Sequence, residues 1–125
     1  MTILVRCSDP RINDYLDYNE VKETLALDNG VAVIANTGSI KYFMEKDQEK
    51  DLFEQLGILV HHFKADTITL LNHTDCGFYK SVGQDSEENY LNDLKKMKAE
   101  IAKIYPNIKI NGYLMDTSSG ELKSI

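Results

Sequence analysis

Two short polar segments hold the residues of this sequence that are best suited to chemistry. Cys7–Arg11 (CSDPR) contains a thiol, a carboxylate and a guanidinium, and His73–Gly77 (HTDCG) adds an imidazole and a second thiol. The two sulfurs and one imidazole nitrogen of Cys7, His73 and Cys76 form a ligand set that zinc favours in tetrahedral geometry. The chain has only two cysteines, which excludes a structural site of three cysteines and one histidine. Three protein ligands with an open fourth position are typical of catalytic zinc.

Each half of this set also has a plainer interpretation. Cys7 could be a small buried apolar residue, as free cysteines often are, and His73 could be a hydrogen-bonded loop residue. A phosphatase-type cysteine nucleophile is disfavoured, because the C-x5-R spacing would place arginine where the chain has Asn13. A dinucleotide site is unsupported, since no G-x-G-x-x-G segment follows a predicted strand. The metal hypothesis therefore requires a fold that brings the two segments together.

Asp9 and Arg11 form a candidate pair beside the first thiol. Arginine can grip a carboxylate at two points, which fixes the orientation of the carboxylate and keeps it ionised. Pro10, which lies between them, fixes one backbone angle and stiffens the turn. An aspartate held beside a metal ion can bind the ion or accept a hydrogen bond from a group on it. The alternative is an ordinary surface ion pair worth about 0–1 kcal/mol.

Apolar runs rich in β-branched residues predict the strands that would position these side chains. Near-continuous runs of this kind are typical of parallel strands that are covered on both faces. The predicted strands are Thr2–Arg6, Val31–Ala35, Thr67–Leu71 and Ile108–Met115, with a possible edge strand in Gly120–Ile125.

Helical spacing of apolar residues separates these runs. It predicts helices over Leu52–Phe63 and Leu91–Ile104, and a weaker pattern runs from Leu16 to Leu27. Asp85 stands three residues before Glu88 and predicts a capping box at the start of the Leu91–Ile104 helix. Strands that alternate with helices predict one α/β domain over residues 1–125, with a mainly parallel sheet of about four to five strands flanked by helices.

This topology predicts where the two polar segments lie. In open α/β sheets, ligands bind beyond the carboxyl ends of the strands, and both segments directly follow a predicted strand. Neighbouring strands lie about 4.8 Å apart, so side chains that follow two adjacent strands can converge on one ion. The sequence therefore predicts a metal site built from Cys7, His73 and Cys76, with Asp9 and Arg11 beside it.

Charge and hydropathy limit the partners that we expect. Twenty acidic residues against fourteen basic ones give a net charge of −6, which argues against nucleic acid and anionic membranes as partners. The basic residues of 95–103 alternate with apolar ones, as on a solvated helix face. No apolar run reaches the roughly 18 residues of a membrane span, and the first residues do not form a secretory signal. We therefore expect a cytoplasmic protein with reduced cysteines.

Three ordered motifs make this sequence similar to the β-class carbonic anhydrases, in which they read C-x-D-S-R, N-A-G and H-T/S-D-C-G. Here they are Cys7–Arg11, Asn36–Gly38 and His73–Gly77, and the tail residues 106–116 and 119–122 also resemble the last strands of that family. The resemblance implies reversible hydration of CO2 to bicarbonate by a zinc-bound hydroxide. It also implies a homodimer or a higher homo-oligomer.

The resemblance assigns roles to individual residues. It implies that Cys7, His73 and Cys76 bind Zn²⁺ and that Asp9 and Arg11 form the catalytic dyad. In the closed state of the family, Asp9 would itself be the fourth zinc ligand, and in the open state it would pair with Arg11. Asp75, inside the second segment, is expected to bond the backbone of its own loop.

The sequence departs from the family pattern at several positions. Pro10 stands where serine is usual, Thr37 where alanine is usual and Asn72 where glycine is common. The sequence begins six residues before Cys7, so we expect the family's amino-terminal arm and its substrate-side glutamine to be absent. Two alternative functions stay open. One is a non-catalytic zinc-binding domain of the same fold, and the other is hydrolysis of a CO2-like substrate such as carbonyl sulfide or carbon disulfide.

Overall fold

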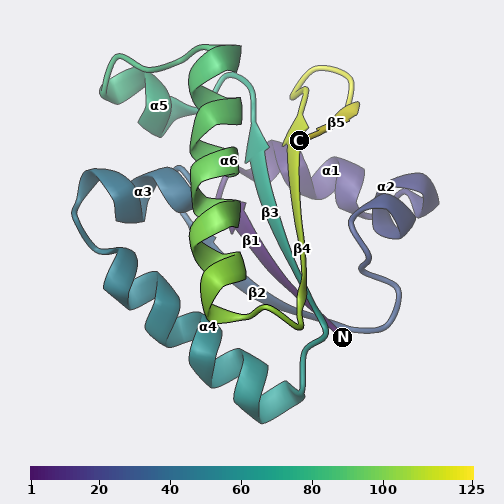
Figure 1. Ribbon diagram of the computed structural model, residues 1–125. Coiled ribbons are helices and arrows are strands. Elements are labelled where there is room, and N and C mark those ends of the chain that lie inside the picture. The colour runs from purple at the N-terminus through teal and green to yellow at the C-terminus, as the bar shows by residue number, and fades with distance from the viewer.

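The centre of the protein is a five-stranded sheet of order β2-β1-β3-β4-β5, seen in a computed structural model that describes all 125 residues (Figure 1). The first four strands are parallel, and β5 runs antiparallel to β4. This confirms the prediction of a single α/β domain with a mainly parallel sheet. The strands are β1 (Thr2–Cys7), β2 (Val31–Asn36), β3 (Thr67–His73), β4 (Lys109–Met115) and β5 (Leu122–Ser124).

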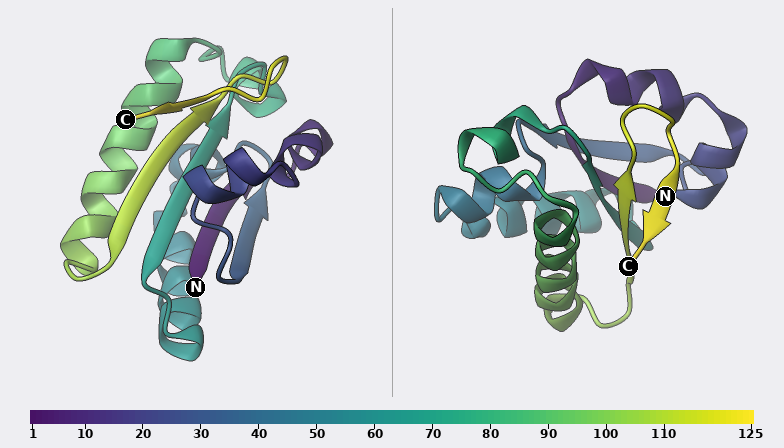
Figure 2. Two further views of the ribbon diagram at one scale, coloured as in Figure 1. Left: turned by 90° about the vertical axis from the view of Figure 1, so that its right-hand side faces the viewer. Right: turned by 90° about the horizontal axis from the view of Figure 1, so that it is seen from above.

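Helices cover both faces of this sheet, which explains why its central strands are apolar (Figure 2). Every residue of β1 and of β3 is buried. One face carries α3 (Ile40–Glu45), α4 (Glu49–Phe63), α5 (Gly77–Ser81) and α6 (Glu87–Ile104). The other face carries the short 3₁₀ helix η1 (Pro10–Ile12), α1 (Asn13–Leu16) and α2 (Asn19–Thr24).

The two long helices confirm the predicted periodicity. Helix α4 buries Leu52 and Leu56, and α6 buries Leu94, Met97 and Ile101. Residues one turn apart share a face, so each helix presents one apolar stripe to the sheet. None of the helices is long and apolar enough to cross a membrane.

The predicted segment Leu16–Leu27 is not one helix. The chain leaves the helical conformation at Tyr18, whose φ of −74° and ψ of 133° are extended, and α1 and α2 are therefore separate. Asp17 and Asn19 flank this break. Short polar side chains of this kind compete for backbone hydrogen bonds and favour helix ends over helix interiors.

The predicted cap of α6 differs from the one in the structure. The N-cap of α6 is Ser86, whose hydroxyl accepts the Asn89 N–H, whereas the predicted cap Asp85 accepts a hydrogen bond from the Tyr90 hydroxyl. Ser39 precedes α3, but its side chain makes no capping bond. The prediction at residue 85 was wrong by one position because aspartate and serine are both good caps.

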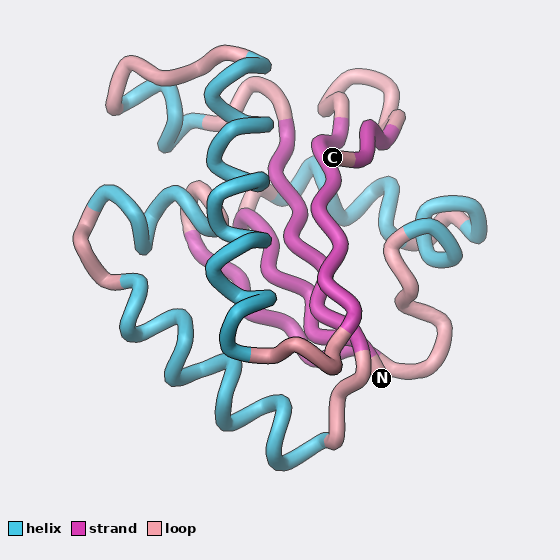
Figure 3. Tube along the Cα trace, in the orientation of Figure 1, coloured by secondary structure: helices cyan, strands magenta, loops and turns pink.

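The register of the sheet brings the three motifs to one edge. Cys7, the last residue of β1, lies opposite Asn36, the last residue of β2. On its other side β1 pairs with β3, which ends at His73. Figure 3 shows the loop that follows β3 beside the loop between β4 and β5, at the same end of the sheet. Cys7 and His73 are thus neighbours in space although 66 positions separate them in the sequence.

Candidate metal centre

Cys7, His73 and Cys76 form a buried cluster at this edge of the sheet. Their ligand atoms all lie within 4.8 Å of one another, and no side chain of the three is more than 5% exposed. Cys7 ends β1 and His73 ends β3, while Cys76 directly precedes α5. Adjacent parallel strands therefore supply the first two groups, and the turn into α5 supplies the third.

One nitrogen of the His73 ring is held by the protein, and the other is free. Nδ1 lies 2.7 Å from the Thr74 carbonyl oxygen and 3.1 Å from the Thr117 hydroxyl. Nε2 is fully buried and has no hydrogen-bond partner. Buried polar atoms almost always have a partner, so an unpartnered nitrogen within 4.8 Å of two sulfurs needs an explanation. The two sulfurs and this nitrogen fit a zinc ion, because a ligating histidine usually donates its other N–H to an oxygen.

The two thiols are electrostatically unequal. The hydrogen bond between the cysteines lowers the pKa of Cys7 to about 4 and raises that of Cys76 above its usual value. The Gly38 N–H also stabilises the Cys7 thiolate and lies 3.2 Å from its sulfur. Thiolate is the form that binds metals, so the metal-free cluster already contains one anionic ligand. Metal binding would release the proton that Cys76 retains.

Asp9 and Arg11 are paired beside the cluster. The guanidinium Nε lies 3.1 and 3.2 Å from the two Asp9 carboxylate oxygens, and the second guanidinium nitrogen lies 2.7 Å from Oδ2. These bonds hold the pKa of the Asp9 carboxyl below its ordinary value. Oδ2 is also 3.8 Å from the free Nε2 of His73. The carboxylate is therefore ionised, fixed in orientation and directed toward the cluster.

Asp75 does not bond its own loop, contrary to the sequence-based expectation. Its carboxylate accepts a 2.8 Å hydrogen bond from Arg11 and forms an ion pair with Lys80. These two cations, Lys80 more than Arg11, lower the pKa of the Asp75 carboxyl to about 2. Its carbonyl oxygen accepts a further Arg11 bond of 3.0 Å. No local pattern predicts this contact, because the two residues are 64 positions apart.

Arg6 is a second functional neighbour that sequence reasoning missed. Only 9% of its surface is exposed, and its Nε donates to the Cys7 carbonyl over 2.8 Å. A further nitrogen donates to the Asp9 carbonyl over 3.0 Å. The guanidinium thus binds the backbone of the turn that carries both Cys7 and Asp9. A charged residue at the end of the apolar run Thr2–Arg6 was the signal that could have found it.

Thr117 supports the imidazole, so its hydroxyl should affect metal affinity. We expect Thr117→Val to weaken zinc binding about tenfold, the lower end of the effect of removing an outer hydrogen bond from a ligand. The lower end applies because the Thr74 carbonyl still contacts Nδ1. Competition with a chromophoric chelator measures the affinity. Thr117→Ser, which keeps the hydroxyl, is the matched control, and equal affinities for the two variants would contradict this role.

A cleft of about 460 Å³ opens over the cluster. Phe78 forms part of its wall. A Cβ on Gly38 would come within 2.7 Å of the Phe78 ring, and Gly38 has a φ of +79°, so glycine is required there. The other lining residues are Cys7, Ser8, Asp9, Pro10, Arg11, Thr37, Cys76 and Gly77.

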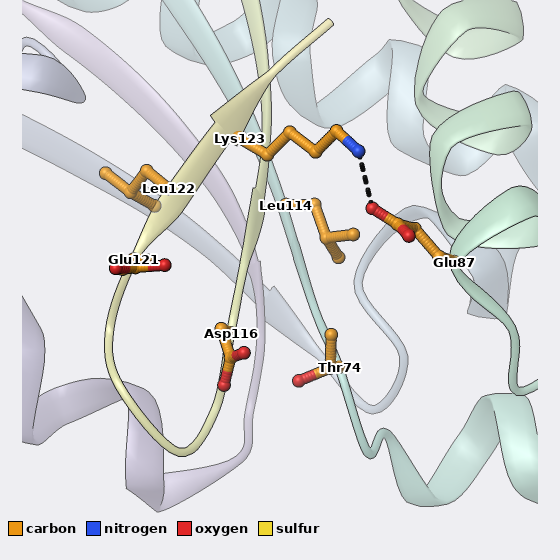
Figure 4. Close-up of a pocket in the computed structure, with 7 residues that line it drawn as sticks. All are labelled: Thr74, Glu87, Leu114, Asp116, Glu121, Leu122 and Lys123. Atoms are coloured by element: carbon orange, nitrogen blue, oxygen red, sulfur yellow. Dashed lines mark hydrogen bonds and ion pairs between the residues drawn. The ribbon is translucent and has the colours of Figure 1, made fainter.

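A second hollow, of about 290 Å³, lies between the loop after β3 and the β4–β5 turn (Figure 4). Thr74 and Asp116 line it, and Lys123 crosses one side to reach Glu87 at 2.6 Å. None of the three candidate ligands lines this hollow. The 460 Å³ cleft is therefore the candidate substrate site.

Comparison with known proteins supports the fold. No protein-family model matches the sequence, and no curated protein matches it. Solved structures match over nearly the whole chain. A β-carbonic anhydrase from Trichomonas vaginalis has a TM-score of 0.64 and 20% identity, over 99% of this chain and 81% of that one. A carbonic anhydrase from Streptococcus mutans has a TM-score of 0.63 and 19% identity, over 99% of this chain and 80% of that one.

A third match describes tetrameric β-carbonic anhydrases from Sordaria macrospora, with a TM-score of 0.58 and 15% identity over 99% of this chain and 79% of that one. The chain therefore has the fold of the β-carbonic anhydrases, as the resemblance of its three motifs implied.

Proposed function

We propose that this protein is a zinc-dependent carbonic anhydrase that converts CO2 and water reversibly to bicarbonate. The observation that carries the proposal is the buried cluster of two sulfurs and one unpartnered imidazole nitrogen, with an arginine-held carboxylate 3.8 Å from that nitrogen. The solved structures of the same fold that are described as carbonic anhydrases support this choice of reaction.

In this proposal Cys7, His73 and Cys76 hold the ion. When bound, zinc lowers the pKa of a coordinated water to about 7 and so supplies a hydroxide nucleophile at neutral pH. The thiolate of Cys7 and the fixed imidazole of His73 need little rearrangement to bind zinc, because the protein already orients both groups. Arg6 keeps the turn that carries Cys7 in place.

Asp9 is the proposed catalytic carboxylate. Because Arg11 keeps it ionised, Asp9 is an acceptor only, and it can hold and orient a proton on the nucleophile. Its position also allows the second role that the family resemblance implies, in which the carboxylate itself becomes the fourth zinc ligand. Arg11 would then determine which of the two roles Asp9 takes.

The cleft suits a small substrate with little polarity. Pro10, Gly77 and Phe78 contribute apolar surface to its lining, and CO2 carries no net charge. The hydroxyls of Ser8 and Thr37 lie 3.4 Å apart on the same lining. The proposed product, bicarbonate, is charged and would leave toward solvent, where the Arg11 side chain is 46% exposed.

A paired measurement of metal content and turnover tests this function. The purified protein should bind one zinc ion per chain and should accelerate CO2 hydration in a stopped-flow assay with a pH indicator. Zinc binding without turnover would instead identify a non-catalytic zinc-binding domain. Faster release of sulfide from carbonyl sulfide or carbon disulfide than hydration of CO2 would move the assignment to those substrates. Absence of zinc binding would refute the proposal altogether.

We further propose a homo-oligomer that forms through β2, in a reducing cytoplasm where both thiols stay free to bind metal. β2 is an edge strand that pairs only with β1. Val31 and Val33 on it are 40% and 50% exposed. An uncharged, apolar edge is a template for another strand, and a second copy could pair with it around a two-fold axis.

A charge on this edge should break the oligomer. We expect Val33→Lys to shift the protein from the mass of two or more chains to that of one, as measured by light scattering after gel filtration. Ile58→Lys is the matched control, because Ile58 on α4 is 60% exposed but lies outside β2. Dissociation by both variants, or by neither, would contradict a β2 interface.

A further inference from the structure

We infer that Asp75 is a positioning residue that fixes Arg11 and thereby keeps the Asp9 carboxylate bound to Arg11 rather than to the metal. This inference rests on the proposed function, since it concerns the choice between the two roles of Asp9. Asp75 belongs to the same loop as His73 and Cys76, but its carboxylate points to the guanidinium rather than into the cluster.

The guanidinium of Arg11 is held on two edges by two carboxylates. Nε and one terminal nitrogen bind Asp9, with contacts between 2.7 and 3.2 Å. The other terminal nitrogen binds the Asp75 carboxylate at 2.8 Å. The two carboxylates use different N–H groups, so they do not compete for the arginine. The planar fork of arginine is suited to such two-sided binding, and lysine at this position could not reproduce it.

The Asp75 carboxylate adds a second anchor, beside the carbonyl oxygen of the same residue, to the exposed side chain of Arg11. Its side chain is 46% exposed, against 14% for that of Asp9. A long exposed side chain samples many rotamers and loses that freedom when it holds a single geometry. The contact with Asp75 restricts the rotamers of Arg11 whether or not Asp9 is bound, so the arginine remains aligned for Asp9.

Lys80 completes the arrangement from α5. Its ammonium group pairs with Oδ1 of Asp75, while Oδ2 accepts the bond from Arg11. Each oxygen of Asp75 thus has its own cation, which fixes the rotation of the carboxylate. A network of several charges holds its geometry better than an isolated surface pair.

The position of Asp9 makes this anchoring consequential. Oδ2 is the Asp9 atom that binds Arg11 at 2.7 Å, and the same atom lies 3.8 Å from the free nitrogen of His73. One oxygen is therefore within reach of both the arginine and the metal ligands. If the Arg11 side chain becomes mobile, this oxygen is more often free to bind the metal. If Arg11 is held in place, the oxygen stays in its ion pair with Arg11.

Asp75→Asn is the variant that tests this role with least disturbance. Asp75 has a φ of +56°, a left-handed conformation that asparagine tolerates well and most other residues do not. The loop backbone should therefore keep its shape, and Cys7, His73 and Cys76 should still bind zinc. Only the charge and one carboxylate oxygen are lost.

The measurement is azide binding to the cobalt-substituted protein, followed in the visible absorption spectrum. If Asp9 competes for the ion more strongly in the variant, azide should bind about two- to fivefold more weakly, the range expected for a partly exposed ion pair. Loss of a nearby negative charge would by itself make an anion bind more tightly. Weaker azide binding therefore indicates that Asp9 has moved to the metal, and tighter azide binding indicates a simple charge effect.

A double-mutant cycle with Asp9→Asn separates positioning from loop structure. In the Asp9→Asn background, Asp75→Asn should no longer weaken azide binding, because the competing carboxylate is gone. Glu88→Gln, at an exposed carboxylate of α6 with no ion pair, is the charge control and should leave azide binding unchanged.

Equal weakening in both backgrounds, or no weakening in either, would overturn the role of Asp75 while leaving the metal centre intact. Failure of the unaltered protein to bind cobalt would refute the proposed function and this inference with it.

Discussion

Replacing Cys7 by serine should abolish tight metal binding and, with it, CO2 hydration. Cys7 is the sulfur that the protein stabilises as a thiolate, through Cys76 and the Gly38 N–H. A serine hydroxyl stays protonated at neutral pH and is a poor zinc ligand. Removing an outer hydrogen bond from a ligand already costs 10- to about 100-fold in metal affinity, so losing the ligand itself should cost more than 100-fold.

The experiment compares zinc stoichiometry and stopped-flow turnover before and after the substitution. Serine nearly matches cysteine in size, so the buried position should stay packed, and circular dichroism checks that the fold is retained. Thr37→Ala, at an exposed residue of the same cleft, is the control for metal content and should retain one zinc per chain. A Cys7→Ser protein that still carries stoichiometric zinc would contradict the proposed ligand set.

The second large effect should come from Asp9→Asn, which separates metal binding from catalysis. Asparagine keeps the size of the side chain and can still accept the Arg11 backbone N–H, so η1 and zinc binding should persist. The carboxylate charge is lost, and with it the acceptor that would orient the nucleophile. Groups that handle a proton in this way contribute about 10²–10⁴-fold to rate, and we expect a loss of at least 100-fold in kcat.

Steady-state hydration rates and zinc content, measured on the same preparation, test this expectation. A variant with full zinc and full turnover would remove Asp9 from the mechanism. Loss of zinc together with turnover would instead give Asp9 a structural role in the turn. The two substitutions thus have different signatures: Cys7→Ser removes the metal, and Asp9→Asn leaves it in place.

The strands and the long helices could be predicted because their signals are local. Apolar runs such as Thr67–Leu71 and the leucine stripe of α4 follow from side-chain periodicity alone. The meeting of Cys7 with His73 could also be predicted, because parallel topology brings strand ends to one edge. The short helices α1 and α2 were not separated, since a polar break of two residues is a weak signal against an apolar pattern.

The contacts that surround the cluster could not be predicted in the same way. Asp75 binds Arg11 and Thr117 binds His73, each across more than forty positions. Neither pair has a spacing rule, because the contacts depend on how loops from different strands pack. Asp75 was expected to bond its own loop, as aspartates in turns commonly do. The guanidinium of Arg11, which comes from another segment, binds the Asp75 carboxylate instead.

The pairing of β1 with β3 has a consequence for how the protein acquires its ion. These strands are joined residue by residue from Thr2 with Thr67 to Val5 with Leu70, inside a core of 25 buried residues. Small zinc fingers, in contrast, are unfolded without zinc and fold only when they bind it. Here hydrophobic packing stabilises the fold, so the chain should be folded before it binds metal. Chelation should therefore inactivate the protein reversibly, and resupply should restore it without refolding.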